Sequence, residues 1–367
     1  MHGKVVTLAG DREVEVVDIE EPPEVEPEAV FTEVVRTNVC GSELHFWRKE
    51  MPIPSGAVLG HEAVLRVAEL GDEVSTDSAG ESIAEGDLVA PVYFKPCGTC
   101  PACRNGQDHA CDLMRSTGEW MQPHQVPPHY RGTFATHYYL DEDQEFYKVP
   151  EGVSPEVAAG ANCALSQVLF GLESAGLRRG DSVAIQGAGG LGLAATAVAK
   201  TAGAEVIVIE GAKRRLEQAE AFGADHLVDL NEFESPGERA RRVQELTGGA
   251  GADIGLEVAG FPEVFSEGPE LLRNGATYLE VGNISPGLTT EFAPASITTK
   301  RITVMAQMLY PPWYLKRALD FLDDHGDAFP FDELVDAEYS LEEAQTALEH
   351  SDEHSVTRAC LVPEHGD

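Results

Sequence analysis

The second half of the chain alternates short apolar runs with stretches in which apolar and polar residues are mixed at helical spacing. The apolar runs predict strands at 182–186, 205–210, 226–230, 253–258 and 276–281. The mixed stretches predict helices at 191–201, 213–222, 236–247 and 263–273. Such an alternation of strands and helices implies a parallel sheet with right-handed crossover connections.

The first ninety residues follow another pattern. Short alternating stretches, for example 30–35 and 86–90, are interrupted by Gly and Pro. They predict an irregular, β-rich domain. The segment 91–131 that follows is rich in Pro, Gly, Cys and His and has little periodicity, which is typical of loops.

Helix signals reappear near residue 152. Ser154 followed by Pro155 indicates the start of a helix, because Ser is a good N-cap and Pro fits the first helical position. Past residue 300 the pattern is mixed. There we expect helices at 313–324 and 341–350 and a last strand at 356–362.

The two sequence patterns, one alternating strands with helices and one rich in short strands, indicate two domains. The length of 367 residues also favours two domains. We expect an α/β protein in which a doubly wound domain covers residues 153–300. A β-rich domain would be formed by residues 1–152 together with residues 301–367.

The charge balance changes the picture of the surface. Asp and Glu number 63 against 26 Lys and Arg, so the formal net charge is −37. Nucleic acids and anionic membranes are poor partners for such a chain. The acids are spread over the whole sequence rather than gathered in a tail, and Arg outnumbers Lys. We therefore expect adaptation to high salt, where counterions screen the repulsion between carboxylates.

No stretch approaches the roughly 18 consecutive apolar residues that a membrane span needs. The opening residues also lack the charged-then-apolar pattern of an export signal, so we expect a cytoplasmic protein. In that compartment clustered cysteines favour metal binding over disulfides. The chain has seven cysteines: Cys40, Cys97, Cys100, Cys103, Cys111, Cys163 and Cys360.

Four of these cysteines lie within fifteen residues of one another in the Pro- and Gly-rich segment: Cys97, Cys100, Cys103 and Cys111. Four thiolates around a tetrahedral zinc leave no open position, so a zinc bound here would be structural. Two disulfides, an iron–sulfur cluster and a zinc ribbon for nucleic acid are the alternatives. The acidic charge of the chain disfavours the zinc ribbon. The iron–sulfur cluster is disfavoured because the sequence shows no second electron carrier.

A glycine-rich turn follows the first strand of the alternating half. The pattern G-x-G-x-x-G is met by the turn Gly187-Ala188-Gly189-Gly190-Leu191-Gly192. In dinucleotide-binding proteins the first Gly makes the tight turn, the second lets the backbone approach the pyrophosphate, and the third allows close packing of helix on strand. The N-terminus of the following helix attracts the phosphate charge.

An acid, Glu210, closes the second strand, eighteen residues beyond Gly192. Its carboxylate can accept the ribose hydroxyls of NAD and would repel the extra phosphate of NADP. Arg214 and Arg215 lie just downstream and would favour that phosphate instead. We favour NAD over NADP, while an ordinary solvated Glu remains the alternative for Glu210.

A second set of residues of the types that bind metals lies outside the four-cysteine segment. Cys40, Ser42 and His45 come from one short stretch, and the pair His61-Glu62 follows later. One thiolate, one imidazole and one further ligand leave a fourth position on zinc for water or an alkoxide. Taken alone, a single Cys is most often a small buried hydrophobe.

Together the motifs resemble the zinc-containing medium-chain alcohol dehydrogenase family over nearly the whole chain. The family order is met by Cys40-Gly41-Ser42 with His45 five residues after the Cys, Gly60-His61-Glu62, the four-cysteine segment, Cys163 and the glycine-rich turn. The resemblance implies a GroES-like catalytic domain and a Rossmann dinucleotide-binding domain. It also implies two zinc ions per chain, one structural and one catalytic.

The resemblance assigns ligands to the catalytic zinc: Cys40, His61 and Cys163. Glu62 would lie beside the metal and coordinate it transiently. Glu43 stands where the family usually has Asp, the acceptor for the ligand His. Its extra methylene group leaves that contact open.

Further roles follow from the same resemblance. Ser42 would take the proton of the alcohol, and His45 would pass it to solvent through the ribose of the cofactor. The backbone of Val281-Gly282-Asn283 would line the nicotinamide pocket. Arg358 would either reach the cofactor phosphate or lie on the surface.

Substrate selection should fall to side chains near the zinc, for which the candidates are Phe46, Trp47, Tyr93 and the segment 115–131. That segment is rich in aromatic and His residues. It would be a lid or a surface loop stiffened by Pro, with His124 and His129 as loop residues rather than ligands.

The aromatic content favours a bulky or cyclic secondary alcohol, with polyols, sugars and threonine as alternatives. Two other classes remain open: a zinc or redox protein without turnover, and a zinc-free quinone or enoyl reductase. The intact set of candidate ligands disfavours both. The family suggests a homodimer or a homotetramer.

Overall fold

Backbone contacts in the computed structural model, which describes residues 2–20, 25–112 and 122–365, divide the chain into two units. Unit 1 consists of Met1–Cys163, Pro311–Asp327 and Phe331–Asp367. Unit 2 consists of Ala164–Tyr310 and Ala328–Pro330.

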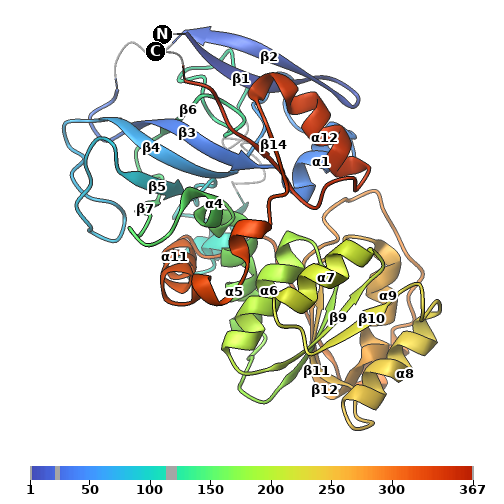
Figure 1. Cartoon of the computed structure of the whole chain (residues 1–367). Coiled ribbons are helices and arrows are strands. Elements are labelled where there is room, and N and C mark those ends of the chain that lie inside the picture. Colours follow the sequence, from blue (N-terminus) through green and yellow to red (C-terminus); the bar gives the residue numbers. More distant parts are fainter. Residues whose placement is uncertain (1, 21–24, 113–121, 366–367) are drawn as a thin grey trace. The chain divides into compact units, whose positions relative to one another are not determined.

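Unit 2 is built on a parallel sheet (Figure 1). In the described chain its strands are β8 (Ser182–Gln186), β9 (Glu205–Glu210), β10 (His226–Asp229), β11 (Ala252–Glu257), β12 (Leu272–Glu280) and β13 (Thr303–Ala306). They lie in the order β10-β9-β8-β11-β12-β13. If they are renumbered along the chain, this is the 3-2-1-4-5-6 order of the Rossmann fold. The prediction of a doubly wound domain is therefore confirmed.

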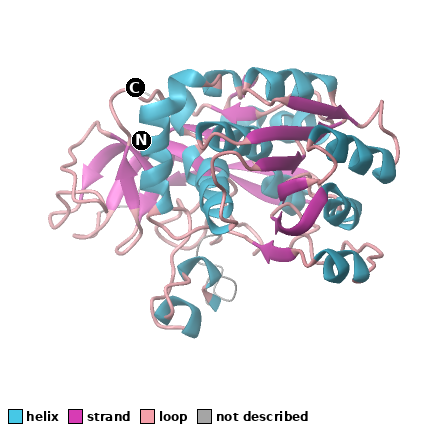
Figure 2. Cartoon of the chain, turned by 90° about the horizontal axis from the view of Figure 1, so that it is seen from below, coloured by secondary structure: helices cyan, strands magenta, loops and turns pink. Residues whose placement is uncertain are grey.

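The central strands are almost continuously apolar because helices cover both faces of the sheet, as Figure 2 shows. The helices of this unit are α5 (Ser166–Ser174), α6 (Gly190–Thr201), α7 (Lys213–Ala221), α8 (Pro236–Leu246), α9 (Pro262–Leu271) and α10 (Ala295–Lys300). Helix α8 shows why they begin where they do. Ser235 and Glu238 form a capping box at its start, and Pro236 fills its first turn.

Both unit boundaries differ from the sequence-based ones. We expected residues from 301 onward in the β-rich domain, but β13 pairs in parallel with β12 along Thr303–Ala306. This strand has only four residues and is largely exposed, so it carries little apolar pattern. At the first boundary, expected after residue 152, the short helix α4 (Pro155–Ala158) and the residues up to 163 remain with unit 1.

Unit 1 has a mostly antiparallel sheet in the order β14-β15-β3-β4-β5-β7. Its strands are β3 (Val30–Asn38), β4 (Glu62–Leu70), β5 (Leu88–Pro91), β7 (Phe146–Lys148), β14 (Ala337–Tyr339) and β15 (Ala359–Leu361). Strand β6 (His137–Leu140) also pairs with β3. A separate hairpin is formed by β1 (His2–Gly10) and β2 (Glu13–Glu20).

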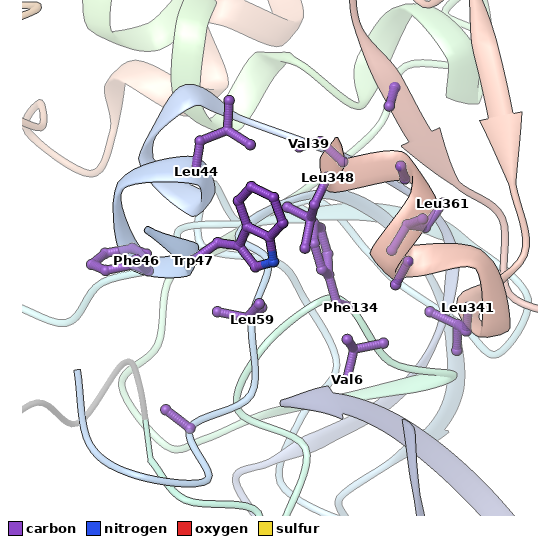
Figure 3. Packing of buried hydrophobic residues seen from close by; sticks show 14 residues of the cluster. Val6, Val39, Leu44, Phe46, Trp47, Leu59, Phe134, Leu341, Leu348 and Leu361 are labelled. Carbon is purple, nitrogen blue, oxygen red and sulfur yellow. The ribbon is translucent and has the colours of Figure 1, made fainter. Parts of the chain in front are cut away.

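One core of unit 1 packs α1 (Gly41–Trp47) against α12 (Ala344–Asp352) (Figure 3). Phe46 and Trp47 lie inside this core, at 2% and 3% exposure. Figure 3 shows Trp47 beside Leu59 and Phe134. The structure thus places both residues in the core of unit 1, and their suggested place in a substrate pocket stays a prediction.

The predicted helix at 313–324 is α11 (Tyr314–His325), and the predicted strand at 356–362 contains β15. Both belong to unit 1. Among the described residues no helix has the length and apolar character that crossing a membrane requires.

Candidate metal and dinucleotide sites

The first cluster of metal-binding side chains joins Cys40, His61, Glu62 and Cys163, whose ligand atoms all lie within 4.8 Å of one another. Cys40 is the N-cap of α1, directly after β3. His61 and Glu62 stand at the start of β4, which pairs with β3 so that Glu62 faces Asn38. Cys163 comes from a π-helical turn, Ala161–Leu165.

The distances inside this cluster are short. The Cys163 sulfur lies 4.0 Å from the Cys40 sulfur and 3.4 Å from the His61 Nε2 atom. Two thiols, an imidazole and a carboxylate are donor types that zinc accepts. The residues present therefore fit a zinc ion.

Glu43 holds the His61 ring from the other side. Its Oε1 atom lies 2.5 Å from His61 Nδ1, and its Oε2 atom accepts a hydrogen bond of 2.9 Å from the Cys40 backbone N–H. The longer side chain of Glu thus still reaches the histidine. A carboxylate on one ring nitrogen fixes the ring so that the other nitrogen can bind a metal.

The environment of Cys40 favours its thiolate form. The hydrogen bond from Cys163 holds the pKa of the Cys40 thiol well below its usual value, against the opposing effect of burial. The neighbouring His61 and Arg358 charges act in the same direction. The thiolate is the form of Cys that binds metals.

Arg358 lies in this cluster and not on the surface, which was one of the two places expected for it; contact with a cofactor phosphate stays a prediction. It is 7% exposed and its guanidinium is paired with the fully buried carboxylate of Glu62. The sheet explains the contact: β15 pairs Cys360 with Asn38, and β3 pairs Asn38 with Glu62. No sequence motif signals a pairing across 296 positions.

The two candidate proton carriers both lie on α1. The Ser42 hydroxyl oxygen is buried and has no hydrogen-bond partner within the described residues. The His45 Nδ1 atom lies 2.5 Å from a carboxylate oxygen of Glu50. Sequence reasoning missed Glu50, which follows the helix with no motif around it.

Of the proposed pocket residues, Tyr93 remains near the cluster, with its ring 4.6 Å from the ring of His61. Part of the candidate lid, residues 115–121, lies outside the described residues. In the rest of it, His124 and His129 bond through Nδ1 to the backbone carbonyls of Gly56 and His124. Neither belongs to a metal-binding group of the described chain.

The second metal-binding cluster holds the four cysteines of the loop segment, Cys97, Cys100, Cys103 and Cys111, with sulfurs within 4.8 Å of one another. The Cys100 sulfur lies 3.5 Å from that of Cys103 and 4.0 Å from that of Cys111. These separations exceed the roughly 2.05 Å of a disulfide bond. Backbone N–H groups of the loop also point at the sulfurs, as at Cys97 and Cys100. The set fits a closed tetrahedral site.

The glycine-rich turn of unit 2 joins β8 to α6. Gly187 has φ +104°, a conformation that favours Gly, and a Cβ atom on Gly192 would lie 2.0 Å from the Gly187 carbonyl oxygen. At Gly189, the N-cap of α6, a Cβ atom would meet nothing within 4 Å. The turn therefore leaves open space beside Gly189, at the helix N-terminus, as a bound pyrophosphate requires.

Glu210 ends β9 and faces this turn. Its carboxylate accepts hydrogen bonds from the backbone N–H groups of Ala188, Gly211 and Ala212, at 3.0, 2.7 and 2.9 Å. Arg215 lies 3.7 Å from the same carboxylate. Glu210 is therefore not an ordinary solvated residue, and one of the two arginines is already near an acid.

Two further acids, which the sequence did not reveal, end the neighbouring strands. Glu257 closes β11 and accepts hydrogen bonds of 2.7 Å from the backbone of Ala259 and Gly260. It also accepts from Gly282, one of the expected nicotinamide-pocket residues. Glu280 closes β12 beside it. Burial, and then the neighbouring Glu280, raise the pKa of Glu257 to about 8.

A Rossmann sheet with this turn, and a separate unit with two metal-binding clusters, define the class of zinc-binding dehydrogenases. Family comparisons agree. Residues 26–151 match the alcohol dehydrogenase GroES-like domain, and residues 190–324 match the zinc-binding dehydrogenase domain. The chain belongs to the zinc-containing medium-chain alcohol dehydrogenase family, and unit 1 contains its GroES-like domain.

Individual relatives agree over most of the chain. The 5-exo-hydroxycamphor dehydrogenase of Pseudomonas putida is 33% identical over 331 residues, which is 88% of each chain. The sorbitol dehydrogenase of Halalkalibacterium halodurans is 27% identical over 94% of this chain and 95% of its own. Among solved structures, an alcohol dehydrogenase of Thermotoga maritima matches with a TM-score of 0.89 and 27% identity, over 99% of this chain and all of its own.

Proposed function

We propose that the protein is a zinc-dependent dehydrogenase that transfers hydride between an alcohol and NAD, giving the ketone or aldehyde. The observation that carries this proposal is the cluster of Cys40, His61 and Cys163, with Glu43 on the far side of the His61 ring. A zinc-free reductase would have no use for this set. A zinc protein without turnover would not need the glycine-rich turn and the acid facing it.

Two zinc ions per chain have separate tasks in this proposal. Cys97, Cys100, Cys103 and Cys111 would hold the structural ion. Cys40, His61 and Cys163 would hold the catalytic one, with Glu62 beside it. A zinc ion in that place supplies a Lewis acid that lowers the pKa of the alcohol hydroxyl.

The proton of the alcohol leaves through α1. The Ser42 hydroxyl oxygen accepts this proton while giving up its own, and the His45 ring takes up the released proton and carries it toward solvent. The contact of Glu50 with His45 Nδ1 orients the ring, so that Nε2 is the nitrogen that receives the proton. The dinucleotide supplies the hydride acceptor, and this chain binds and orients it.

NAD is the proposed dinucleotide because of Glu210. A carboxylate that already accepts three backbone hydrogen bonds is fixed in place, and it would repel a 2′-phosphate. Arg215 next to it is the feature that favours NADP. Initial rates with NAD and with NADP decide between the two.

A bulky or cyclic secondary alcohol is the proposed substrate. The aromatic ring of Tyr93 beside His61 supports an apolar wall, and the relative from Pseudomonas putida is named for a hydroxycamphor, a cyclic compound. Polyols, sugars and threonine are the alternative, supported by the relative named sorbitol dehydrogenase. A panel of alcohols assayed in molar salt distinguishes them.

We also propose a homodimer or homotetramer in the cytoplasm. The largely exposed strand β13 ends the parallel sheet, and Val304 on it is 37% exposed. An unpaired strand edge of this kind is suited to pairing with a second copy. Sedimentation in molar salt measures the oligomeric state.

The decisive experiment replaces a ligand of the catalytic cluster. In Cys40→Ser the expected result is turnover reduced to background and one zinc lost per chain, because a hydroxyl replaces the thiolate. Dinucleotide binding, measured by fluorescence of the bound reduced form, should be unchanged. Cys360→Ser, which removes a buried thiol outside both clusters, is the control. Normal turnover in Cys40→Ser would contradict the proposed catalytic site.

A further inference from the structure

A third group of metal-binding side chains lies at one edge of β3. Strand β4 pairs with β3 from Val30 to Asn38 and so occupies one of its two edges. Strand β15 and strand β6 share the other edge. Strand β15 pairs with the end of β3, at Thr37 and Asn38, and β6 pairs with the beginning of β3. The chain that follows β15 therefore runs toward β6 along β3.

Three side chains meet where these two segments approach each other. The register of β3 and β6 places Glu33 directly opposite His137. His365 arrives four residues after β15, and its Nε2 atom lies 3.0 Å from the carbonyl oxygen of Val34. One ligand atom from each of Glu33, His137 and His365 lies within 4.8 Å of the other two.

Each imidazole is held through one ring nitrogen. His137 Nδ1 lies 2.8 Å from the hydroxyl oxygen of Thr136, and its ring stacks on Phe31 at 4.9 Å. His365 Nε2 donates to the Val34 carbonyl. In metal sites a ligand His nearly always engages its second nitrogen in this way, which sets the tautomer and the orientation of the ring.

Burial and charge also suit a cation at this place. His137 is 6% exposed and Glu33 is half-buried opposite it. The Glu33 carboxylate would offset one of the two positive charges of a zinc ion.

We propose that Glu33, His137 and His365 form a third zinc site, separate from the two cysteine-containing clusters, with water in its fourth position. Two imidazoles and a carboxylate are an established ligand set for zinc. The ligand atoms, at most 4.8 Å apart, would move to about 3.3 Å from one another, the spacing set by zinc–ligand bonds of about 2.05 Å in a tetrahedron. The bound ion links the segment after β15 to β3 and β6. Its role is to fix this end of the chain to the sheet.

Zinc analysis of the whole protein tests the proposal. The protein is dialysed against zinc buffered at increasing free concentrations, and bound zinc is counted by elemental analysis. Three zincs per chain are expected at saturation, one for each cluster. His365→Ala should retain two, and because His365 is exposed the variant should fold normally. Glu33→Gln should bind the third ion more weakly.

His226→Ala is the matched control. His226 also contacts an acid, Glu205, at 2.9 Å on the surface, but the described residues bring no second imidazole to the pair. This variant should keep three zincs. Equal zinc content in wild type and His365→Ala would overturn the proposal, as would a wild type that saturates at two. The result is independent of the catalytic site, because failure of that assignment would appear as unchanged zinc in Cys40→Ser.

Discussion

At the scale of single residues, two carboxylates on or after α1 orient two imidazoles. A carboxylate oxygen of Glu43 lies 2.5 Å from Nδ1 of His61. A carboxylate oxygen of Glu50 lies 2.5 Å from Nδ1 of His45. The first contact fixes a metal-binding ring. The second fixes a ring that we propose moves a proton. One short segment of chain thus orients both the proposed zinc ligand and the proposed proton carrier.

Glu50→Gln tests the second contact. The amide can still bond to His45 Nδ1, but it cannot stabilise the positive charge that the ring gains on accepting a proton. We expect kcat for alcohol oxidation to fall about tenfold, while zinc content and the Kd for NADH are unchanged. Glu69→Gln, the same charge change at an exposed position of β4, should have no effect. An unaltered kcat in Glu50→Gln would exclude Glu50 from the relay.

Local spacing could predict the candidate metal residues, because thiols and imidazoles are rare and their intervals are informative. It could not predict the residues around them. Arg358 reaches Glu62 only through pairing of β15, β3 and β4. Phe46 and Trp47 follow the same motif as His45, yet the helical periodicity of α1 turns them into the core.

At the scale of elements, the ends of β11 and β12 bring two acids together. Glu257 and Glu280 are the last residues of these parallel strands, so their side chains emerge at the same edge of the sheet. The amide of Asn283 donates to both, at 3.1 and 2.9 Å. The backbone N–H of Gly282 donates a further hydrogen bond to Glu257.

This pair should make stability depend on pH. Burial, and then Glu280, raise the pKa of Glu257 from 4.5 to about 8. The folded protein therefore holds a proton that the unfolded chain has lost, and the free energy of unfolding falls as pH rises between these values. In Glu280→Gln the fall should be smaller by on the order of 2 kcal/mol.

Chemical denaturation at a series of pH values, in constant salt, measures this difference. Glu291→Gln, the same change at an acid outside the pair, should show the same dependence of the unfolding free energy on pH as the wild type. Identical slopes for wild type and Glu280→Gln would show that the two carboxyls do not share a proton.

The alternating half of the chain was predictable element by element. Strands β8 and β9 begin and end at the expected residues, since each is an apolar run with a Gly directly after it. Strand β13 was not, because a short edge strand with exposed side chains lacks the apolar signal. The π-helical turn that carries Cys163 has no sequence signature either.

At the scale of the whole molecule, the net charge of −37 dominates. Like charges already lie close together: a hydrogen bond and the charge of Glu142 raise the pKa of Glu28. Both residues line a cavity of about 650 Å³ in unit 1, together with Glu26 and Glu73. Such repulsion is screened over about 3 Å at 1 M salt but over about 30 Å at 0.01 M.

We expect the protein to require salt for stability. Transfer from molar to millimolar potassium chloride should lower Tm by roughly 10 °C or more, because unscreened repulsion favours the expanded chain. Differential scanning calorimetry over a salt series measures this. Sucrose in place of salt stabilises by exclusion from the protein surface but does not screen charge, so it should restore only part of the lost Tm at low salt. A Tm independent of salt would reject the expected adaptation.

The unit boundaries have a practical consequence for protein engineering. Cys40, His61 and Cys163 all belong to unit 1, and Cys163 is the last residue before the chain enters unit 2. The main return crossing lies between Tyr310 and Pro311, and only the three residues Ala328–Pro330 beyond it group with unit 2. A chimera that exchanges the dinucleotide-binding module should therefore be joined at these two points. A joint placed ten residues earlier, where the sequence texture changes, would import a foreign thiol into the metal cluster.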